Sequence, residues 1–180
     1  MPILGIWASQ NYPRVTDTGA MFPISTVTVG SAGASSITFS SIPSTYTHLQ
    51  IRGLGLITSG GGFTARFNGD TGANYSFHQL YGEGSIAQSN AGAVTQTFMY
   101  FAYGAGSTTA PNAFVTDVLD YANTNKNKTV RSLNGNDLNG SGYIQLWSNA
   151  WYSTSAITSI TVTASFNQYS QLALYGIKGA

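Results

Sequence analysis

Side-chain alternation with a period of two residues is the feature that most constrains what this chain can fold into. In residues 63–68, FTARFN, phenylalanine or alanine occupies every second position, and threonine, arginine or asparagine occupies the positions between. This alternation matches the two faces of a β-strand. No 3.6-residue pattern lasts three helical turns anywhere in the chain. The sequence therefore predicts an all-β protein.

Short alternating segments recur along the chain and are separated by clusters rich in Gly, Asn and Ser. The Asn68-Gly69 dipeptide favours a left-handed hairpin turn, so we expect the segments 63–68 and 75–81 to pair. Many short strands at even spacing predict an antiparallel, jelly-roll-like β-sandwich. The predicted strands cover residues 24–29, 36–40, 47–57, 63–68, 75–81, 94–103, 114–121, 128–133, 142–148, 156–164 and 170–177.

Charged residues are unusually rare. They make up 7% of the 180 residues, against about 25% in ordinary soluble domains. Because 42% of the residues are hydrophobic and 13% are aromatic, we expect a folded domain and not a disordered chain. The formal net charge of +1 argues against nucleic acid as a partner. The chain has no cysteine, which excludes disulfides and thiolate metal sites, and we expect no cofactor.

The first 23 residues differ from the remainder and predict an extended N-terminal arm, followed by a sandwich domain over residues 24–180. The arm contains three prolines and carries apolar side chains that it cannot bury against itself: Ile3, Leu4, Ile6 and Trp7. Its opening lacks a basic segment, so we expect neither a signal peptide nor a membrane anchor. Two interpretations remain open: the arm packs on its own domain, or it docks on a neighbouring subunit, where tryptophan is enriched at hot spots.

The stretch of residues 117–137 holds six of the thirteen charged side chains. Asp117 and Asp120 are three residues apart, which on a strand places them on opposite faces, so they form no catalytic carboxylate pair. An EF-hand calcium loop is excluded by the residues at its sixth and twelfth positions. We expect two paired strands joined by a solvated loop, with acids and bases facing each other across the ladder.

Candidate catalytic groups are scarce. The two histidines, His48 and His78, lack an obvious nucleophile, and no nucleophile elbow or phosphate-binding loop occurs. We therefore expect no enzymatic activity. A loop of Ser, Asn and Thr surrounds Trp151 and Tyr152, which predicts either stacking on a sugar or burial in a partner.

Four blocks of sequence resemble a module of tailed-bacteriophage virion proteins. They are SSITFSSIPSTYTHLQIRG (35–53), RFNGDTGANYSFHQLYGEG (66–84), DVLDYANTNKNKTVRSLNGND (117–137) and SAITSITVTASFNQYSQLALYGIKG (155–179). The opening ILGIWASQ also resembles the start of standalone members of this module. The resemblance implies a non-enzymatic virion component with an all-β sandwich, often a homotrimer. It carries over no catalytic or binding residues.

These observations leave three candidate functions for the protein. The first is a capsid decoration (cement) protein, made in the host cytoplasm and attached through its arm to the major capsid protein. The second is a tail-fibre or receptor-binding tip that recognises host surface glycans and is joined to other tail components. The third is a carbohydrate-active enzyme, for which Asp117, Asp120 and Asp137 are the acids to test. We expect the first, with no membrane association.

Overall fold

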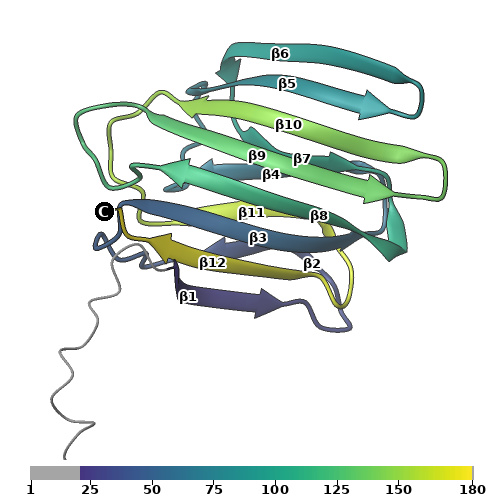
Figure 1. The fold of residues 1–180 in the computed structure, drawn as a ribbon. Coiled ribbons are helices and arrows are strands. Elements are labelled where there is room, and N and C mark those ends of the chain that lie inside the picture. The colour runs from purple at the N-terminus through teal and green to yellow at the C-terminus, as the bar shows by residue number, and fades with distance from the viewer. Residues whose placement is uncertain (1–20, 180) are drawn as a thin grey trace, which may run out of the picture.

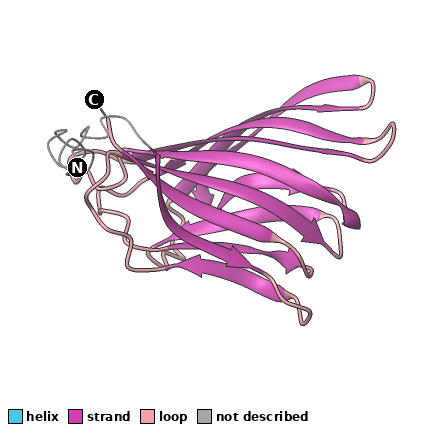
Figure 2. Ribbon diagram, turned by 60° about the horizontal axis from the view of Figure 1, so that its bottom comes forward, coloured by secondary structure: helices cyan, strands magenta, loops and turns pink. Residues whose placement is uncertain are grey.

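The structure, a computed structural model, describes residues 21–179. All the regular structure in this range is β-strand (Figure 2). The strands are β1 (Met21–Thr28), β2 (Ala34–Phe39), β3 (His48–Ile57), β4 (Gly61–Phe67), β5 (Tyr75–Glu83), β6 (Ile86–Gln96), β7 (Met99–Gly104), β8 (Ser107–Leu119), β9 (Lys128–Asp137), β10 (Gly142–Trp151), β11 (Ile160–Phe166) and β12 (Gln171–Ile177). Among the described residues, no helix is long and apolar enough to cross a membrane.

The strand pairings are nested. Strand β1 pairs with β12, β2 with β11, β3 with β8 and β4 with β7, and every one of these pairs is antiparallel. Two hairpins extend this arrangement, because β9 and β10 pair beside β8, and β5 and β6 pair beside β10. The early strands therefore fold back along the late ones in reverse order.

These pairings produce two layers of unequal width (Figure 1). The large layer has the order β6-β5-β10-β9-β8-β3-β12-β1, and the small layer has the order β2-β11-β4-β7. The two layers share one ladder contact, in which Phe166 of β11 lies opposite Ile57 of β3. The antiparallel all-β architecture expected from the alternation is confirmed.

The apolar core fills the space between the small layer and the β3–β8 region of the large layer. Phe63, Ala65 and Phe67 of β4 all point into it, as their alternation predicts. The ring of Phe63 lies 5.4 Å from that of Phe114 in β8 and 5.7 Å from that of Phe166, in tilted and edge-on contacts that favour aromatic pairs. This core joins the two layers.

Two expectations about local structure are wrong. Asn68 and Gly69 do adopt left-handed conformations, but β4 pairs with β7 and β11 and not with β5. The chain instead crosses to the large layer, where β5 pairs with β10. The segment 94–103 is also not one strand, because β6 ends at Gln96 and β7 begins at Met99.

The first strand begins three residues earlier than expected, because β1 begins at Met21. Residues 1–20, which include the apolar arm residues Ile3, Leu4, Ile6 and Trp7, lie outside the described residues.

Polar side chains of the large layer hydrogen-bond the outer edge of β7. The amides of Asn149 and Asn134 donate to the carbonyls of Tyr100 and Tyr103, at 2.9 and 3.0 Å, and Gln145 accepts from the Tyr103 N–H at 3.1 Å. An unpaired strand edge inside a protein would leave these backbone groups unsatisfied. The inner face of β9 and β10 is therefore rich in buried amides where the rest of the core is apolar.

Candidate functional site

The acids of the 117–137 stretch are spread along two strands. Asp117 lies on the outer face of β8, opposite Arg131 in register, and accepts a hydrogen bond from Gln50 at 2.8 Å. Asp137 lies six residues beyond Arg131 on β9, which is about 20 Å along a strand. The expected pairing of two strands is confirmed, and Asp137 cannot share a reaction centre with Asp117.

Asp120 lies in the turn after β8 and contacts two bases. Its carboxylate accepts a hydrogen bond from Lys126 and lies 3.3 Å from Nδ1 of His48. The Lys126 hydrogen bond holds the pKa of Asp120 below its ordinary value, although partial burial opposes it. The same His48 nitrogen accepts the backbone N–H of Asp120, so these contacts fix a turn.

Lys128 is the least expected residue of the charged stretch, because it is 1% exposed. Its ammonium group donates to the carbonyls of Asn123, Lys126 and Thr154 at 2.6, 3.0 and 3.2 Å. Burial lowers its pKa. Lys128 therefore organises the loop between β8 and β9. Over residues 21–179, no group of three or more His, Asp or Glu side chains is placed to hold a metal ion.

The outer face of the large layer carries the most conspicuous candidate surface, which we call the outer stripe. It consists of six large aliphatic side chains from five strands, each between 38% and 65% exposed: Leu54, Leu80, Val115, Leu133, Ile144 and Leu146. Cross-strand pairing places Leu80, Leu146, Leu133 and Val115 in one continuous row. Isolated exposed aliphatic residues are ordinary, but a contiguous row is typical of an interaction surface.

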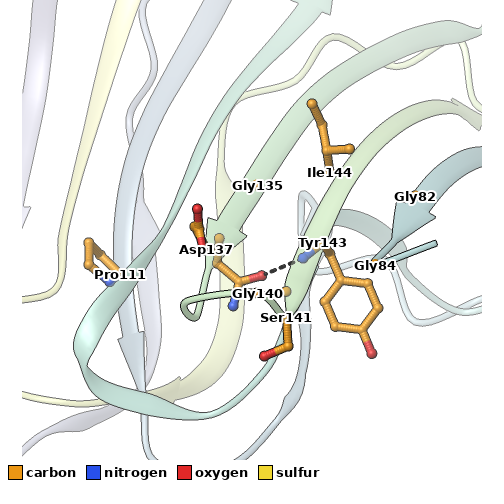
Figure 3. Close-up of a pocket in the computed structure, with 11 residues that line it drawn as sticks. Gly82, Gly84, Pro111, Gly135, Asp137, Gly140, Ser141, Tyr143 and Ile144 are labelled. Carbon is orange, nitrogen blue, oxygen red and sulfur yellow. Dashed lines mark hydrogen bonds between the residues drawn. The ribbon is translucent and has the colours of Figure 1, made fainter.

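A second row makes the outer stripe uneven. Next to the leucine row, Leu54, Ala113, Gly135, Ile144 and Gly82 are consecutive cross-strand partners, and their small members leave a depression of about 530 Å³ between Leu54 and Ile144. A further hollow of about 650 Å³ lies beside it at the β9–β10 turn, where Gly82, Gly135, Gly140 and Ile144 form much of the lining (Figure 3). The apolar face is therefore bumpy, with ridges and hollows.

Arg52 continues the leucine row as the cross-strand partner of Val115, and a row with further charged residues lies on the other side of the leucine row. There, Gln50, Asp117, Arg131, Ser148 and His78 follow one another across the same strands. The apolar and charged rows are thus parallel and adjacent. His78 is exposed in this row, where Ser148 is its cross-strand partner.

The opposite, inner face of the large layer forms a second candidate site, which we call the inner cleft. The small layer ends at β7, so the inner faces of β5, β6 and part of β10 extend beyond it (Figure 1). A cleft of about 290 Å³ lies against this overhang. Ten residues line it: Phe77, Gln79, Tyr81, Glu83, Asn90, Tyr100, Tyr103, Tyr143, Gln145 and Trp147.

The aromatic pair predicted as a ligand loop is placed differently from expectation. Trp151 ends β10 and is 2% exposed; it packs on Phe67 and Tyr75, and its indole N–H donates to Asp70 at 2.7 Å. The interpretation of Trp151 as a loop side chain free to meet a ligand is therefore wrong. Tyr152, the next residue, is exposed.

One of the two surfaces could have been recognised from side-chain alternation. In β10, Ile144 and Leu146 alternate with Gln145 and Trp147, so one face is aliphatic and the other mixed. The pattern identifies two faces but not which one is covered. The inner cleft had no such signal, because its residues come from four strands that are not all neighbours in the sequence.

Comparisons with protein-family models, with curated proteins and with solved structures found no match.

Proposed function

We propose that this protein is a non-enzymatic structural component of a tailed-bacteriophage virion, most specifically a capsid decoration protein, whose copies contact one another through the outer stripe. The observation that carries the proposal is the inverted polarity of β9 and β10. Their aliphatic residues face outward, whereas the amides of Asn134 and Gln145 are buried. The edge of β7 accounts for the buried amides, but it does not account for a contiguous row of exposed aliphatic side chains, and a domain whose outer face is covered gains the burial of those side chains.

A second copy of the chain is the occupant that best fits the outer stripe. Each stripe residue is about half exposed, and covering it contributes about 1 kcal/mol. In a trimer the stripes of three copies would meet around the three-fold axis. Six residues on each of three copies therefore contribute about 18 kcal/mol, against two association steps that each cost about 4–15 kcal/mol. With a partner whose contact surface is polar, only the stripe of this chain would be an apolar surface removed from water, so the gain would be about half as large. The adjacent charged row, with Asp117 and Arg131 side by side, supplies both signs for register between copies.

The phage assignment is supported by the four resembling sequence blocks and by the nested strand order. The order β1-β12-β3-β8 in one layer and β2-β11-β4-β7 in the other is that of a rolled-up hairpin, and it supports a jelly roll in which the β5–β6 and β9–β10 hairpins are insertions. Jelly rolls occur in capsid and lectin domains, although fold alone does not establish function.

In this proposal, the N-terminal arm attaches the protein to the capsid shell. The apolar side chains of Ile3, Leu4, Ile6 and Trp7 would bind the major capsid protein, while the outer stripe holds copies of the domain together, as a homotrimer. The protein would then be located on the virion. The short chain and low charge support such a repeated part, since few flexible charged side chains have to be immobilised at its contacts.

The mass of the full chain in solution tests the contact between copies. We expect a trimer at about 100 µM protein and a monomer for Leu133→Asp, which places a charge at the centre of the stripe. Thr163→Asp, on the exposed face of the small layer, is the matched control and should stay trimeric. A monomeric wild-type protein, or unchanged association of Leu133→Asp, would refute the stripe contact. A dimeric wild-type protein would be consistent with the stripe contact but would contradict the proposed trimer.

Attachment is tested with phage heads that lack the protein. The variant without residues 1–20 keeps β1 and should fold, but it should no longer sediment with heads, whereas the full chain should. Full occupancy by the truncated variant would overturn the role of the arm.

A second candidate function, a tail-fibre or receptor-binding tip that recognises host glycans, is favoured by the aromatic inner cleft. The position of the protein in a virion density map separates the two functions, because density on the tail and none on the head would contradict decoration.

A further inference from the structure

The inner cleft exists because the two layers have unequal widths. Strand β7 is the last strand of the small layer, and its Tyr100 and Tyr103 form one wall. The opposite wall is the inner face of β5, where Phe77 and Gln79 point toward β7, and β6 closes the far side through Asn90. The cleft therefore lies where a large sheet continues beyond its covering sheet, a concave place of the kind that ligand sites occupy.

Polar groups without protein partners point into this cleft. The carboxamide of Gln79 is on a residue only 9% exposed, yet it has no hydrogen-bond partner among the described residues. Gln145 accepts hydrogen bonds through its oxygen from the Tyr103 N–H and the Trp147 indole, and its amino group is left to face the cleft. Neither amide is among the buried side-chain atoms without a partner, which belong to Asn112, Asn136 and Asn149. The amides of Gln79 and Gln145 therefore reach the solvent of the cleft, where they are available to hydrogen-bond a ligand.

Aromatic rings supply flat surfaces beside these amides. The rings of Tyr100 and Trp147 are stacked with their centroids 4.9 Å apart, and Tyr103 meets Tyr143 edge-on at 5.9 Å. Burial raises the pKa of the Tyr100 hydroxyl, and burial together with nearby Glu83 raises that of Tyr143. Both hydroxyls can donate hydrogen bonds.

The charge of the lining narrows the ligand class. Glu83 is the one charged residue among the ten that line the cleft, and no Lys, Arg or His is present among them. A phosphate- or carboxylate-bearing ligand would meet a like charge and no counter-charge. A single carboxylate is also one fewer than glycoside hydrolysis requires.

We infer that the inner cleft binds a neutral saccharide without cleaving it. Apolar sugar C–H faces would lie on Tyr100 and Tyr103, and sugar hydroxyls would hydrogen-bond the amides of Gln79 and Gln145 and the carboxylate of Glu83. The volume of about 290 Å³ lies at the lower limit for small-molecule sites and fits roughly one or two sugar rings.

This inference stands apart from the contact between copies. The inner cleft and the outer stripe lie on opposite faces of the large layer, so saccharide binding and self-association are separate measurements. Saccharide binding by the inner cleft rests in part on the receptor-binding alternative, because a host glycan is one source of a neutral saccharide. A glycan displayed by a decorated capsid is a second source.

The test uses saturation-transfer NMR and calorimetry on the full chain with maltotetraose, chitotetraose, lactose and mannobiose as neutral probes. Glucose 6-phosphate and sialyllactose serve as charged comparisons. We expect at least one neutral probe to bind with a Kd of about 10⁻³ to 10⁻⁵ M, and the charged comparisons to bind at least tenfold more weakly. No binding by any neutral probe, or equal binding by the charged ones, would overturn the inference.

Variants locate the site. Tyr103→Ala and Gln79→Ala should each weaken binding at least tenfold. Tyr169→Ala is the matched control for the tyrosine, because Tyr169 is exposed and does not line the cleft, and it should bind as the wild type does. Each variant is first checked for an unchanged thermal unfolding profile; if Gln79→Ala fails to fold, Tyr103→Ala decides. Unchanged binding in Tyr103→Ala would place the saccharide elsewhere. Leu133→Asp should bind the probes normally even as a monomer, so failure of one proposal does not imply failure of the other.

Discussion

The amides beneath β7 make a quantitative prediction, for which Asn134→Leu is the sharpest change. Asn134 is buried on the inner face of β9. Its amide donates to the Tyr103 carbonyl at 3.0 Å, and its oxygen accepts from the Trp147 indole N–H at 3.0 Å. The Tyr103 carbonyl would lose its partner, at about 1–3 kcal/mol. The Trp147 indole N–H still donates to the side-chain oxygen of Gln145 at 3.2 Å. Losing its hydrogen bond to Asn134 therefore costs less, about 0.5–1.5 kcal/mol.

Leucine recovers part of this loss, because it is more hydrophobic than asparagine, by about 1 kcal/mol. We therefore expect Asn134→Leu to lower the free energy of unfolding by about 0.5–3.5 kcal/mol. With a urea dependence of about 2 kcal/mol per molar, the unfolding midpoint should fall by about 0.25–1.75 M.

Urea unfolding followed by tryptophan fluorescence measures the shift. The matched control is Asn127→Leu, the same exchange at an exposed loop position, which should change the free energy by no more than about 0.5 kcal/mol. A change in Asn134→Leu as small as that of the control would refute the argument that side chains of the large layer satisfy the edge of β7.

Three further changes have defined outcomes. Gly53→Ala should lower the free energy of unfolding by about 1–3 kcal/mol, because an added Cβ would lie 2.2 Å from the Phe114 ring; wild-type stability in urea would contradict this close approach. Lys128→Met should cost about 2–4 kcal/mol by leaving three backbone carbonyls without their donor, whereas Lys126→Met should cost no more than about 1 kcal/mol, and equal effects in thermal unfolding would contradict the burial of Lys128. Burial raises the pKa of Asp70, but hydrogen bonds from an indole, an amide and a backbone N–H outweigh it and hold that pKa below 3.8; the stability it contributes is therefore present above about pH 4 and lost as pH falls below it. Asp70→Asn should lower stability at pH 7 and flatten the decline between about pH 4 and pH 2, and an unchanged acid profile would contradict this role.

Much of the strand content could be predicted from the sequence, because side-chain alternation is a local property. The buried face of β4, with Phe63 and Phe67, follows directly from its alternation. The pairing of β8 with β9 follows from two alternating segments around a polar loop. The pairing partners of β4, which precedes the Asn68-Gly69 turn, do not follow from the sequence. A turn reverses the chain locally but does not determine which strand lies beside β4.

The candidate surfaces depended on contacts between distant segments. The outer stripe needs five strands in one register, and the inner cleft needs β7 to end the small layer beneath β5 and β10. Lys128 illustrates the same limit: its neighbours in sequence are polar and exposed, yet Thr154, from a distant loop, helps to bury its ammonium group.

The sequence by itself determined that the chain forms strands with two unlike faces, since a period of two residues admits no other regular structure. Tertiary structure alone decided which face is covered. In β9 and β10 the free edge of β7 requires hydrogen-bonding partners, so Asn134 and Gln145 turn inward and Leu133 and Leu146 turn to the surface. A buried backbone edge lacking these amides would be left unsatisfied, and that requirement outweighs the tendency of aliphatic side chains to be buried.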